Sequence, residues 1–177
     1  MLPELEREWT GFLLCPVYTE LFPNTKKGLR EYEKENEITF IFDSSSENES
    51  LARMVVAAFL TRLDPTMEEL ADVKTAVSEA VTNAIIHGYE GKEGKITIHS
   101  KIEENKIEIE IQDNGVGIPD VEKAMEPLYT TKPEMDRSGM GFAFMEAFMD
   151  ELEVVSEQDK GTTVRMKKTI YSALNLS

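Results

Sequence analysis

Two polar side chains on one expected helix are the first residues of this sequence that could do chemistry together. Glu79 and Asn83 lie four positions apart in a segment whose apolar residues recur at helical spacing, so both side chains project from one face. A carboxylate and an amide carbonyl on such a face can meet a nucleotide and its metal ion. Taken alone, the pair is more typical of a solvated helix face, so the surrounding segments must decide.

A glycine-containing loop after an expected strand is the second feature. Asp113 opens the pattern Asp-x-Gly-x-Gly, which Gly115 and Gly117 complete. The carboxylate can accept a hydrogen bond from the amino group of a base, and the glycines let backbone and ligand approach closely. The alternative is a plain glycine turn at the end of a strand.

Hydroxyls, cations and glycines gather before another expected helix. Thr130, Thr131 and Lys132 are followed by the run Arg137-Ser138-Gly139-Met140-Gly141. Free amides and the dipole at a helix N-terminus attract anions, and the two cations stand out in a chain with a net charge of −15. The segment therefore predicts an anion site. A weaker signal, Gly161-Thr162-Thr163 before the last expected strand, offers hydroxyls that can complete a base pocket.

Composition excludes several classes of protein. The 177 residues include 19 Lys and Arg against 34 Asp and Glu, a balance that opposes binding to nucleic acid or to an anionic membrane. The single cysteine, Cys15, rules out an intramolecular disulfide and a cysteine metal cluster. No apolar run approaches the ~20 residues of a membrane span, and the residues before the short apolar stretch near the start are acidic. We therefore expect a cytoplasmic protein without direct nucleic-acid or membrane contact.

The elements that must position these residues follow from periodicity and from breaking residues. A capping box at Thr66 and Glu69 predicts a long helix that ends near Gly88, and two alternating runs predict a β-hairpin. The expected strands are 37–42, 95–102, 106–113, 152–156 and 162–168, and the other expected helices are 51 to before Pro65, 121–125 and one through 142–148. Helices bunched against a mixed, mainly antiparallel sheet make an α+β fold, a two-layer α/β sandwich.

The start of the chain differs from the rest. Residues 1–34 contain Pro3, Pro16 and Pro23 and show no sustained period of a helix or a strand. We expect an N-terminal appendage of uncertain order at 1–34, followed by one domain at 35–177. A start codon assigned too far upstream is the alternative explanation, and the segment receives no function.

The four motifs in this order resemble the Bergerat-type ATP-binding fold, which gyrase-type ATPases, histidine kinases and anti-sigma-factor serine kinases share. Residues 78–89 are similar to the N box of that family, 113–117 to its first glycine box, and 130–141 to its ATP lid and second glycine box. Within the family, the chain is most similar to the sporulation branch of the anti-sigma kinases, through the N box and residues 46–50, 63–67, 127–128, 130–134 and 137–142. The resemblance covers about residues 37–168 and implies that fold.

The resemblance also implies roles for individual residues. Glu79 corresponds to the base that accepts the proton of a serine hydroxyl, and Arg137 to the lid arginine directed at the terminal phosphate. Asn83 corresponds to the ligand of the Mg²⁺ that bridges the ATP phosphates, and Asp113 to the aspartate that accepts from the adenine amino group. The other positions that the resemblance places around ATP are Gly115, Gly117, Thr130, Thr131, Lys132, Ser138, Gly139, Gly141 and Thr163.

Protein partners are implied in the same way. Arg53, by itself a surface arginine, matches an arginine that touches both the sigma factor, sigma F, and the anti-anti-sigma factor, so that one partner displaces the other. The strand at 37–42 corresponds to an edge that helps to form a homodimer. The implied protein is an anti-sigma factor that keeps sigma F from RNA polymerase, and an ATP-dependent serine kinase that inactivates the anti-anti-sigma factor.

Two other functions stay open at this point. The stress-response branch of the same kinases controls a different sigma factor, and the run 63–67 together with the lid favours sporulation instead. A partner-switching module that holds nucleotide without useful catalysis is the second alternative. The presence of both Glu79 and Asn83 favours the kinase, because a pure binder has no need of the base.

Overall fold

The computed structural model describes residues 35–126 and 139–171. The expected appendage at 1–34 lies outside the described residues, so it stays a prediction. The elements in chain order are β1 (Glu35–Asp43), α4 (Glu47–Leu60), η1 (Thr61–Leu63), α5 (Met67–Asn83), η2 (Ala84–Gly88), β2 (Lys95–Glu103), β3 (Lys106–Asp113), α6 (Val121–Ala124), α7 (Gly141–Phe148), β4 (Glu151–Glu157) and β5 (Gly161–Thr169). Apart from the short turns η1 and η2, each of these helices and strands agrees with an expected one within a few residues.

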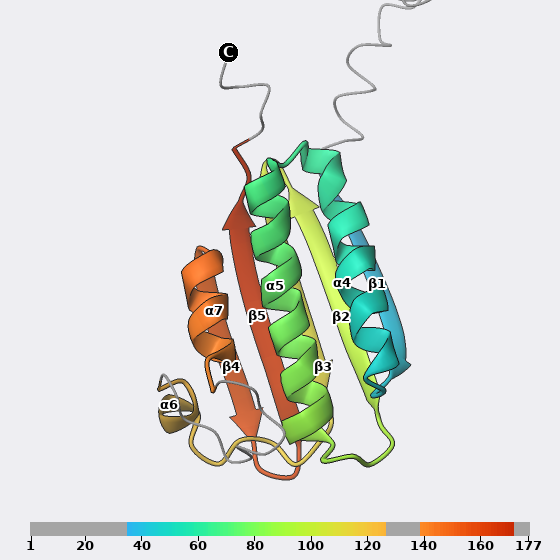
Figure 1. Ribbon diagram of the computed structural model, residues 1–177, viewed down its shortest axis with the longest axis vertical. Helices are drawn as coiled ribbons and strands as arrows, with labels where there is room; N and C mark the ends of the chain where they lie inside the picture. The colour runs from blue at the N-terminus through green and yellow to red at the C-terminus, as the bar shows by residue number, and fades with distance from the viewer. Residues whose placement is uncertain (1–34, 127–138, 172–177) are drawn as a thin grey trace, which may run out of the picture. The chain divides into compact units, whose positions relative to one another are not determined.

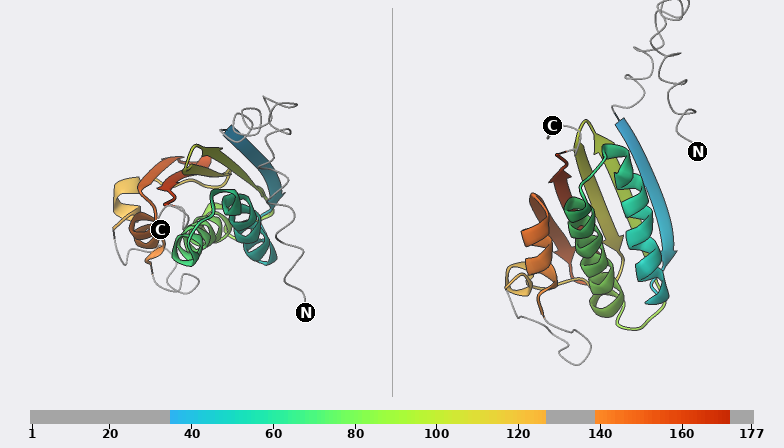
Figure 2. Two further views of the ribbon diagram at one scale, coloured as in Figure 1. Left: turned by 90° about the horizontal axis from the view of Figure 1, so that it is seen from above. Right: turned by 45° about the horizontal axis from the view of Figure 1, so that its top comes forward.

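A five-stranded sheet in the order β1-β2-β3-β5-β4 forms one layer (Figure 1). The pairs β2–β3, β3–β5 and β4–β5 are antiparallel. Helices α4, α5 and α7 cover one face of the sheet, as the view from above shows (Figure 2). The predicted α+β two-layer sandwich with a mainly antiparallel sheet is therefore confirmed.

The core lies between the sheet and the helices. Strand alternation turns Ile96 and Ile98 of β2 and Ile107, Ile109 and Ile111 of β3 inward, and all of them are buried. Each such side chain contributes about 1.5–3 kcal/mol on leaving water. On the helical side, the apolar stripe of α5 runs through Val73, Ala76, Val77, Ala80 and Val81. Because this apolar face of α5 is buried, the other faces of the helix remain available to contact a ligand or a partner.

The N-terminal end of α5 is closed by the predicted capping box. Thr66 accepts from the Glu69 amide, and Glu69 Oε2 accepts from the Thr66 amide at 2.8 Å. The other oxygen, Glu69 Oε1, accepts from the amide of Tyr171 at 2.8 Å, just beyond β5. Burial alone would raise the pKa of Glu69, but these hydrogen bonds hold it below its ordinary value. This end of the helix is thereby tied to the sheet.

The C-terminal end of α5 continues into η2, a π-helical turn. The expected extent to Gly88 is confirmed, but the amide of Tyr89 donates to the carbonyl of Ala84, five residues back, at 3.0 Å. Such wide turns are often found at functional sites. The Tyr89 hydroxyl donates to the Lys95 carbonyl and accepts from the Asn114 amide at 2.9 Å, so one side chain ties η2 to β2 and to the loop after β3.

Candidate nucleotide-binding site

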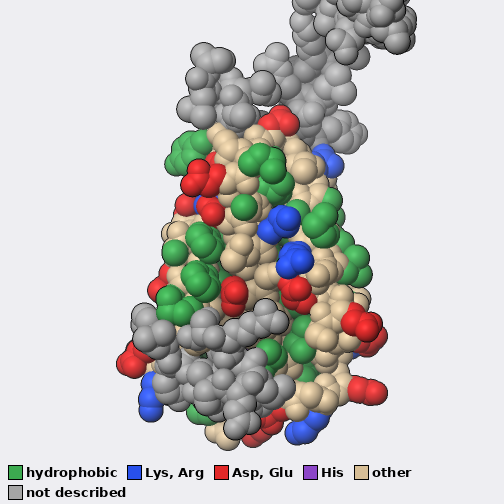
Figure 3. All heavy atoms as spheres, viewed as in Figure 1, with side chains coloured by type: hydrophobic (Ala, Val, Ile, Leu, Met, Phe, Trp, Pro, Cys, Tyr) green, Lys and Arg blue, Asp and Glu red, His purple; other side chains and the backbone are tan. Residues whose placement is uncertain are grey.

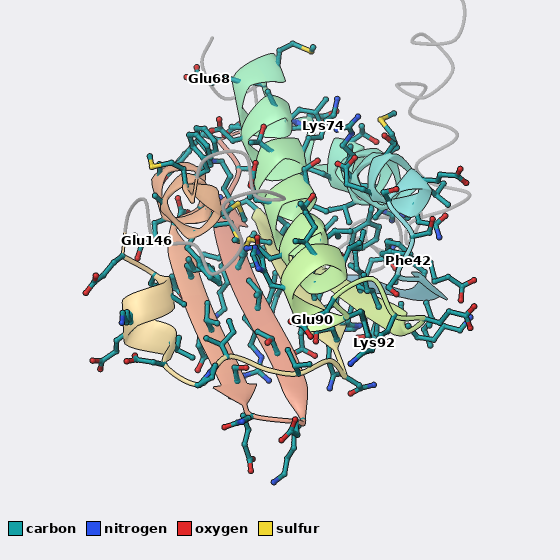
Figure 4. All side chains as sticks on the ribbon, turned by 60° about the horizontal axis from the view of Figure 1, so that its bottom comes forward. Phe42, Glu68, Lys74, Glu90, Lys92 and Glu146 are labelled. Carbon is teal, nitrogen blue, oxygen red and sulfur yellow. The ribbon has the colours of Figure 1, made fainter. Side chains whose placement is uncertain are left out.

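A cavity of about 530 Å³ lies at the C-terminal end of α5. Glu90, which lines it beyond η2, and Glu68, in the first turn of α5, mark the two opposite ends of the helix in Figure 4. The apolar lining residues are Ala80, Ala84, Ile111, Val116, Ile118, Pro119, Ala124, Phe142 and Val164. The polar ones are Asn83, His87, Glu90, Asp113, Asp120, Gln158, Asp159 and Thr162. A mostly apolar wall with a few converging polar groups is the usual form of a small-molecule site.

Asp113, the last residue of β3, is a buried carboxylate that lines this cavity. Its side chain accepts from the Gly115 amide at 2.8 Å and from the backbone of Thr162, and the residue is only 4% exposed. Burial raises the pKa of Asp113 above its ordinary value, although both hydrogen bonds act in the opposite direction. A Cβ on Gly88 would lie 2.9 Å from Asp113 Oδ1. The glycine therefore leaves room beside a carboxylate that can accept from a ligand.

The glycines of the loop after β3 allow close packing against two other segments. A Cβ on Gly115 would lie 2.1 Å from the Gly88 carbonyl oxygen, which also accepts from the Val116 amide at 2.9 Å. Gly117 has a positive φ of 70°, and a Cβ there would lie 2.1 Å from the Glu157 carbonyl oxygen. Gly117 lines the cavity, whereas Gly115 is packed against η2 behind it.

Glu79 and Asn83 lie together opposite the N-terminus of α7. A Cβ on Gly141 would lie 3.1 Å from Glu79 Oε2 and 3.3 Å from Asn83 Nδ2. Both side chains of the predicted pair therefore face the first residue of α7, and Gly141 leaves the space between them open. Asn83, Gly139 and Gly141 line the cavity, and Glu79, which is not among its lining residues, lies beside Gly141. The free amides of α7 add a partial positive charge on this side.

The hydroxyl of β5 that faces the cavity is that of Thr162, and the predicted residue Thr163 lies on the opposite face of the sheet. Thr162 is 9% exposed, lines the cavity and lies opposite Asp113 in the register. Its Oγ1 lies 2.9 Å from Ser156 Oγ, which accepts from the Ile118 amide at 2.7 Å. Thr163 pairs with the exposed Gln112 and Val155. The assignment of Thr163 to the base pocket is therefore corrected to its neighbour.

Sequence reasoning also missed His87. It lines the cavity from the π-helical turn, four residues beyond Asn83. The spacing of four residues from Asn83 could have found it. The predicted residues Thr130, Thr131, Lys132, Arg137 and Ser138 lie outside the described residues, and their roles stay predictions.

The charged side chains that line the described part of the cavity are Glu90, Asp113, Asp120 and Asp159. All four are acidic, so a bound polyphosphate needs cations from elsewhere. The described residues hold no group of three His, Cys, Asp or Glu side chains that could enclose a metal. A single amide oxygen at Asn83 fits Mg²⁺ bound mainly through phosphate oxygens and water, since this ion keeps several waters.

Arg53, the predicted partner contact, lies on α4. It donates to Glu49, Ser50 and Ser78, and 38% of its side chain is exposed. Figure 3 shows Lys and Arg side chains in the middle of the helical face, where α4 and α5 lie side by side, with acidic side chains beside them. Within the described ranges, no helix is both long and apolar enough to cross a membrane.

Known proteins are similar to most of this chain. The model of the histidine kinase-like ATPase domain family matches residues 42–168. An anti-sigma F factor of Thermoanaerobacter pseudethanolicus is 62% identical over 142 residues, which are 80% of this chain and 98% of the relative. An anti-sigma F factor of Clostridium acetobutylicum is 59% identical over 134 residues, 76% of this chain and 94% of the relative.

Solved structures support the fold. The RsbU and RsbW domains of a Mycobacterium tuberculosis protein match with a TM-score of 0.56 at 19% identity, over 76% of this chain and 32% of that one. The nucleotide-free catalytic domain of the histidine kinase ThkA matches with a TM-score of 0.50 at 17% identity, over 75% of this chain and 96% of that one. At such identities the likeness concerns the architecture alone.

Proposed function

The chain belongs to the histidine kinase-like ATPase domain family and, within it, to the anti-sigma F factors; we propose that it binds Mg-ATP in the cavity at the end of α5 and phosphorylates a serine of its anti-anti-sigma partner. It acts in sporulation by binding sigma F and keeping it from RNA polymerase. Phosphorylation inactivates the anti-anti-sigma factor, which would otherwise displace sigma F. Because sigma F acts with RNA polymerase, we assign this activity to the cytoplasm.

Adenine occupies the buried part of the cavity. Asp113 accepts from the exocyclic amino group, which distinguishes adenine from guanine, whose corresponding position carries a carbonyl. The apolar lining, including Ile111 and Val164, covers the flat faces of the base. Thr162, held by Ser156, adds a hydroxyl beside Asp113. The support for this pose is that the buried carboxylate of Asp113 lines the same cavity as apolar side chains such as Ile111 and Val164.

The phosphates extend toward the N-terminus of α7. Asn83 ligates Mg²⁺ through its amide oxygen, and Gly139 and Gly141 supply backbone amides. The metal, when bound, neutralises charge on the phosphate oxygens. From the family resemblance we assign Arg137 to the terminal phosphate, with Thr130, Thr131, Lys132 and Ser138 around it. The acidic lining of the described cavity is the physical reason why these cations are needed.

Glu79 is the proposed general base. The partner serine Oγ attacks the γ-phosphorus, the bond from this phosphorus to the β–γ bridging oxygen breaks, and ADP leaves. The proton of the serine hydroxyl goes to the Glu79 carboxylate. The observation that carries the proposal is that Glu79 and Asn83 converge on Gly141 beside the cavity, which brings base, metal ligand and phosphate amides to one place.

Partner binding is assigned to α4, with Arg53 as the shared contact of sigma F and the anti-anti-sigma factor. We further propose a homodimer in which β1, at the edge of the sheet, takes part. A strand edge with unpaired backbone groups is suited to pairing with a second chain.

The kinase reaction is tested by mixing the full chain, its cognate anti-anti-sigma protein and Mg-ATP labelled at the γ-phosphate. We expect label on a serine of the partner. Absence of transfer while Mg-ATP still binds would favour the second candidate, a partner switch that holds nucleotide without catalysis. Co-purification with sigma F, and not with a stress-response sigma factor, tests the anti-sigma assignment.

A further inference from the structure

A hydrogen-bonded cluster joins α4 to α5 beside the proposed site. Arg53 Nη1 donates to Glu49 Oε1 at 3.1 Å and to Ser78 Oγ at 3.3 Å, and its Nη2 donates to Ser50 Oγ at 3.2 Å. Ser78 Oγ in turn donates to the same oxygen of Glu49. Glu49 therefore accepts from both helices, and it connects Arg53 to the residue that directly precedes Glu79.

The cluster leaves part of Arg53 available. Its described bonds use three of the five N–H donors of a guanidinium. The Arg53 side chain is 38% exposed, whereas that of Glu49 is only 21% exposed. The Glu49 side chain is thus the more buried of the two, and more of the Arg53 side chain is accessible to solvent. A planar donor group held in this way is suited to a carboxylate on another protein.

We propose that Glu49, with Ser78 behind it, is a positioning residue that fixes the guanidinium of Arg53 for an acidic group of the protein partner. The inference rests on the proposed role of Arg53 in partner binding. A long side chain that is already ordered loses less rotamer freedom when the partner docks. Loss of Glu49 is therefore expected to weaken partner binding about fivefold.

A double-mutant cycle separates positioning from direct contact. The four proteins are the full chain, Glu49→Ala, Arg53→Ala and the double variant. Affinity for the unphosphorylated anti-anti-sigma protein is measured with Mg-ADP, so that no phosphoryl transfer occurs. If Glu49 acts through Arg53, its loss weakens binding in the otherwise unchanged chain and adds nothing when Arg53 is already alanine.

The matched control is Glu47→Ala. Glu47 is an acidic residue in the same first turn of α4, so its loss removes the same charge from the same helix end. Affinity within twofold of the unchanged chain is expected for this variant. In the kinase assay with Mg-ATP, Glu49→Ala should raise KM for the partner about fivefold and leave kcat and the affinity for ATP unchanged. A purely structural defect would lower all of these together.

The outcomes distinguish the inference from the proposed function. The positioning role is overturned if Glu49→Ala leaves the affinity unchanged, or if it weakens binding as much in the Arg53→Ala background as in the unchanged chain. In either case, weaker binding by the single variant Arg53→Ala still supports the docking role of Arg53. Tighter binding in Glu49→Ala overturns the positioning role as well, because it would make Glu49 a competitor for Arg53. Unchanged affinity in Arg53→Ala overturns the docking assignment itself.

Discussion

At its N-terminal end α5 presents the carboxylate of Glu69, and three helical turns later the same helix presents that of Glu79. The oxygens of Glu69 accept from backbone amides of the chain itself, those of Thr66 and Tyr171. Glu79 instead faces Gly141 together with Asn83. One residue type thus accepts from backbone amides at one end of the helix and lies beside Gly141, a residue that lines the cavity, at the other.

Surroundings decide what a carboxylate does in this protein. Hydrogen bonds from the backbone lower the pKa of Glu69, and burial raises that of Asp113 at the cavity floor. The first group stabilises the fold in its charged form, whereas the second is buried where it lines a cavity, and burial disfavours its charged form. Groups of the second kind often mark functional sites. The comparison therefore predicts that substitutions at the Glu79 end of α5 reduce activity, and that substitution of Glu69 at the other end reduces stability.

The largest expected effect is at Glu79. Glu79→Ala should reduce transfer to the partner serine by about 10²–10⁴-fold, because the general base is lost. Affinities for Mg-ATP and for sigma F should stay largely unchanged. Single-turnover transfer of labelled phosphate measures the first, and equilibrium titrations measure the others. A variant that phosphorylates the partner at the normal rate would refute the assigned base.

The next effect is at Asp113. Asp113→Asn should weaken Mg-ATP binding about tenfold to a hundredfold, the value of a hydrogen bond to a charged group. Discrimination between ATP and GTP should fall with it. Calorimetric titration with each nucleotide checks both expectations. Equal affinity for ATP in the variant and the unchanged chain would remove Asp113 from the adenine site.

A smaller effect is expected from pH. In the proposed pose adenine binding needs the Asp113 carboxylate, and burial raises the pKa of this group, so protonation begins at a higher pH than for an exposed aspartate. Affinity for ATP should therefore decline as pH falls toward that pKa, while the already weakened Asp113→Asn variant shows no such decline from this group. ATP titrations of the unchanged chain and of Asp113→Asn, across the acidic pH range in which the fold persists, test this difference. Parallel declines of ATP affinity with pH in the two proteins would contradict it.

The smallest effect is on stability, at the other end of α5. Glu69→Gln should lower the free energy of unfolding by about 1 kcal/mol, as loss of a capping interaction does, and leave ATP binding intact. Because the pKa of Glu69 is lower in the folded chain, its contribution is complete above the unfolded pKa and is lost as pH falls through the folded one. Denaturant unfolding measures both, with the exposed neighbour variant Glu68→Gln as control. Equal losses in the two variants would contradict the role of the cap.

Local features of the fold were predictable from the sequence, because their signals are local. The capping box needs only Thr66 and Glu69 three residues apart, and the hairpin of β2 and β3 follows from alternation. The pairing order of the sheet is different, since β5 inserts between β3 and β4. The alternation of residues within a strand does not specify which other strand it pairs with.

The site was predictable in part. The grouping of Asp113, Asn83 and Gly141 around one space followed from the resemblance that the order of motifs carries. The motif 161–163 included Thr162, but the base pocket was assigned to Thr163, and His87 was missed. The signal for Thr162 was present, because Val164 and Met166 on the same side of β5 are apolar and buried. His87 lies in the π-helical turn η2 and lines the cavity. Its spacing of four residues from Asn83 was a signal that the interpretation of the motifs did not use.

Hydrogen exchange of backbone amides in the full chain, with and without Mg-ATP, tests most directly whether the functional end of α5 is the one at Glu79 and Asn83. We predict added protection in η2 and in the loop 113–118, and none at residues 66–70 around the capping box. Protection confined to the capping-box end, or none in the loop after β3 under saturating Mg-ATP, would contradict the assignment of the nucleotide site.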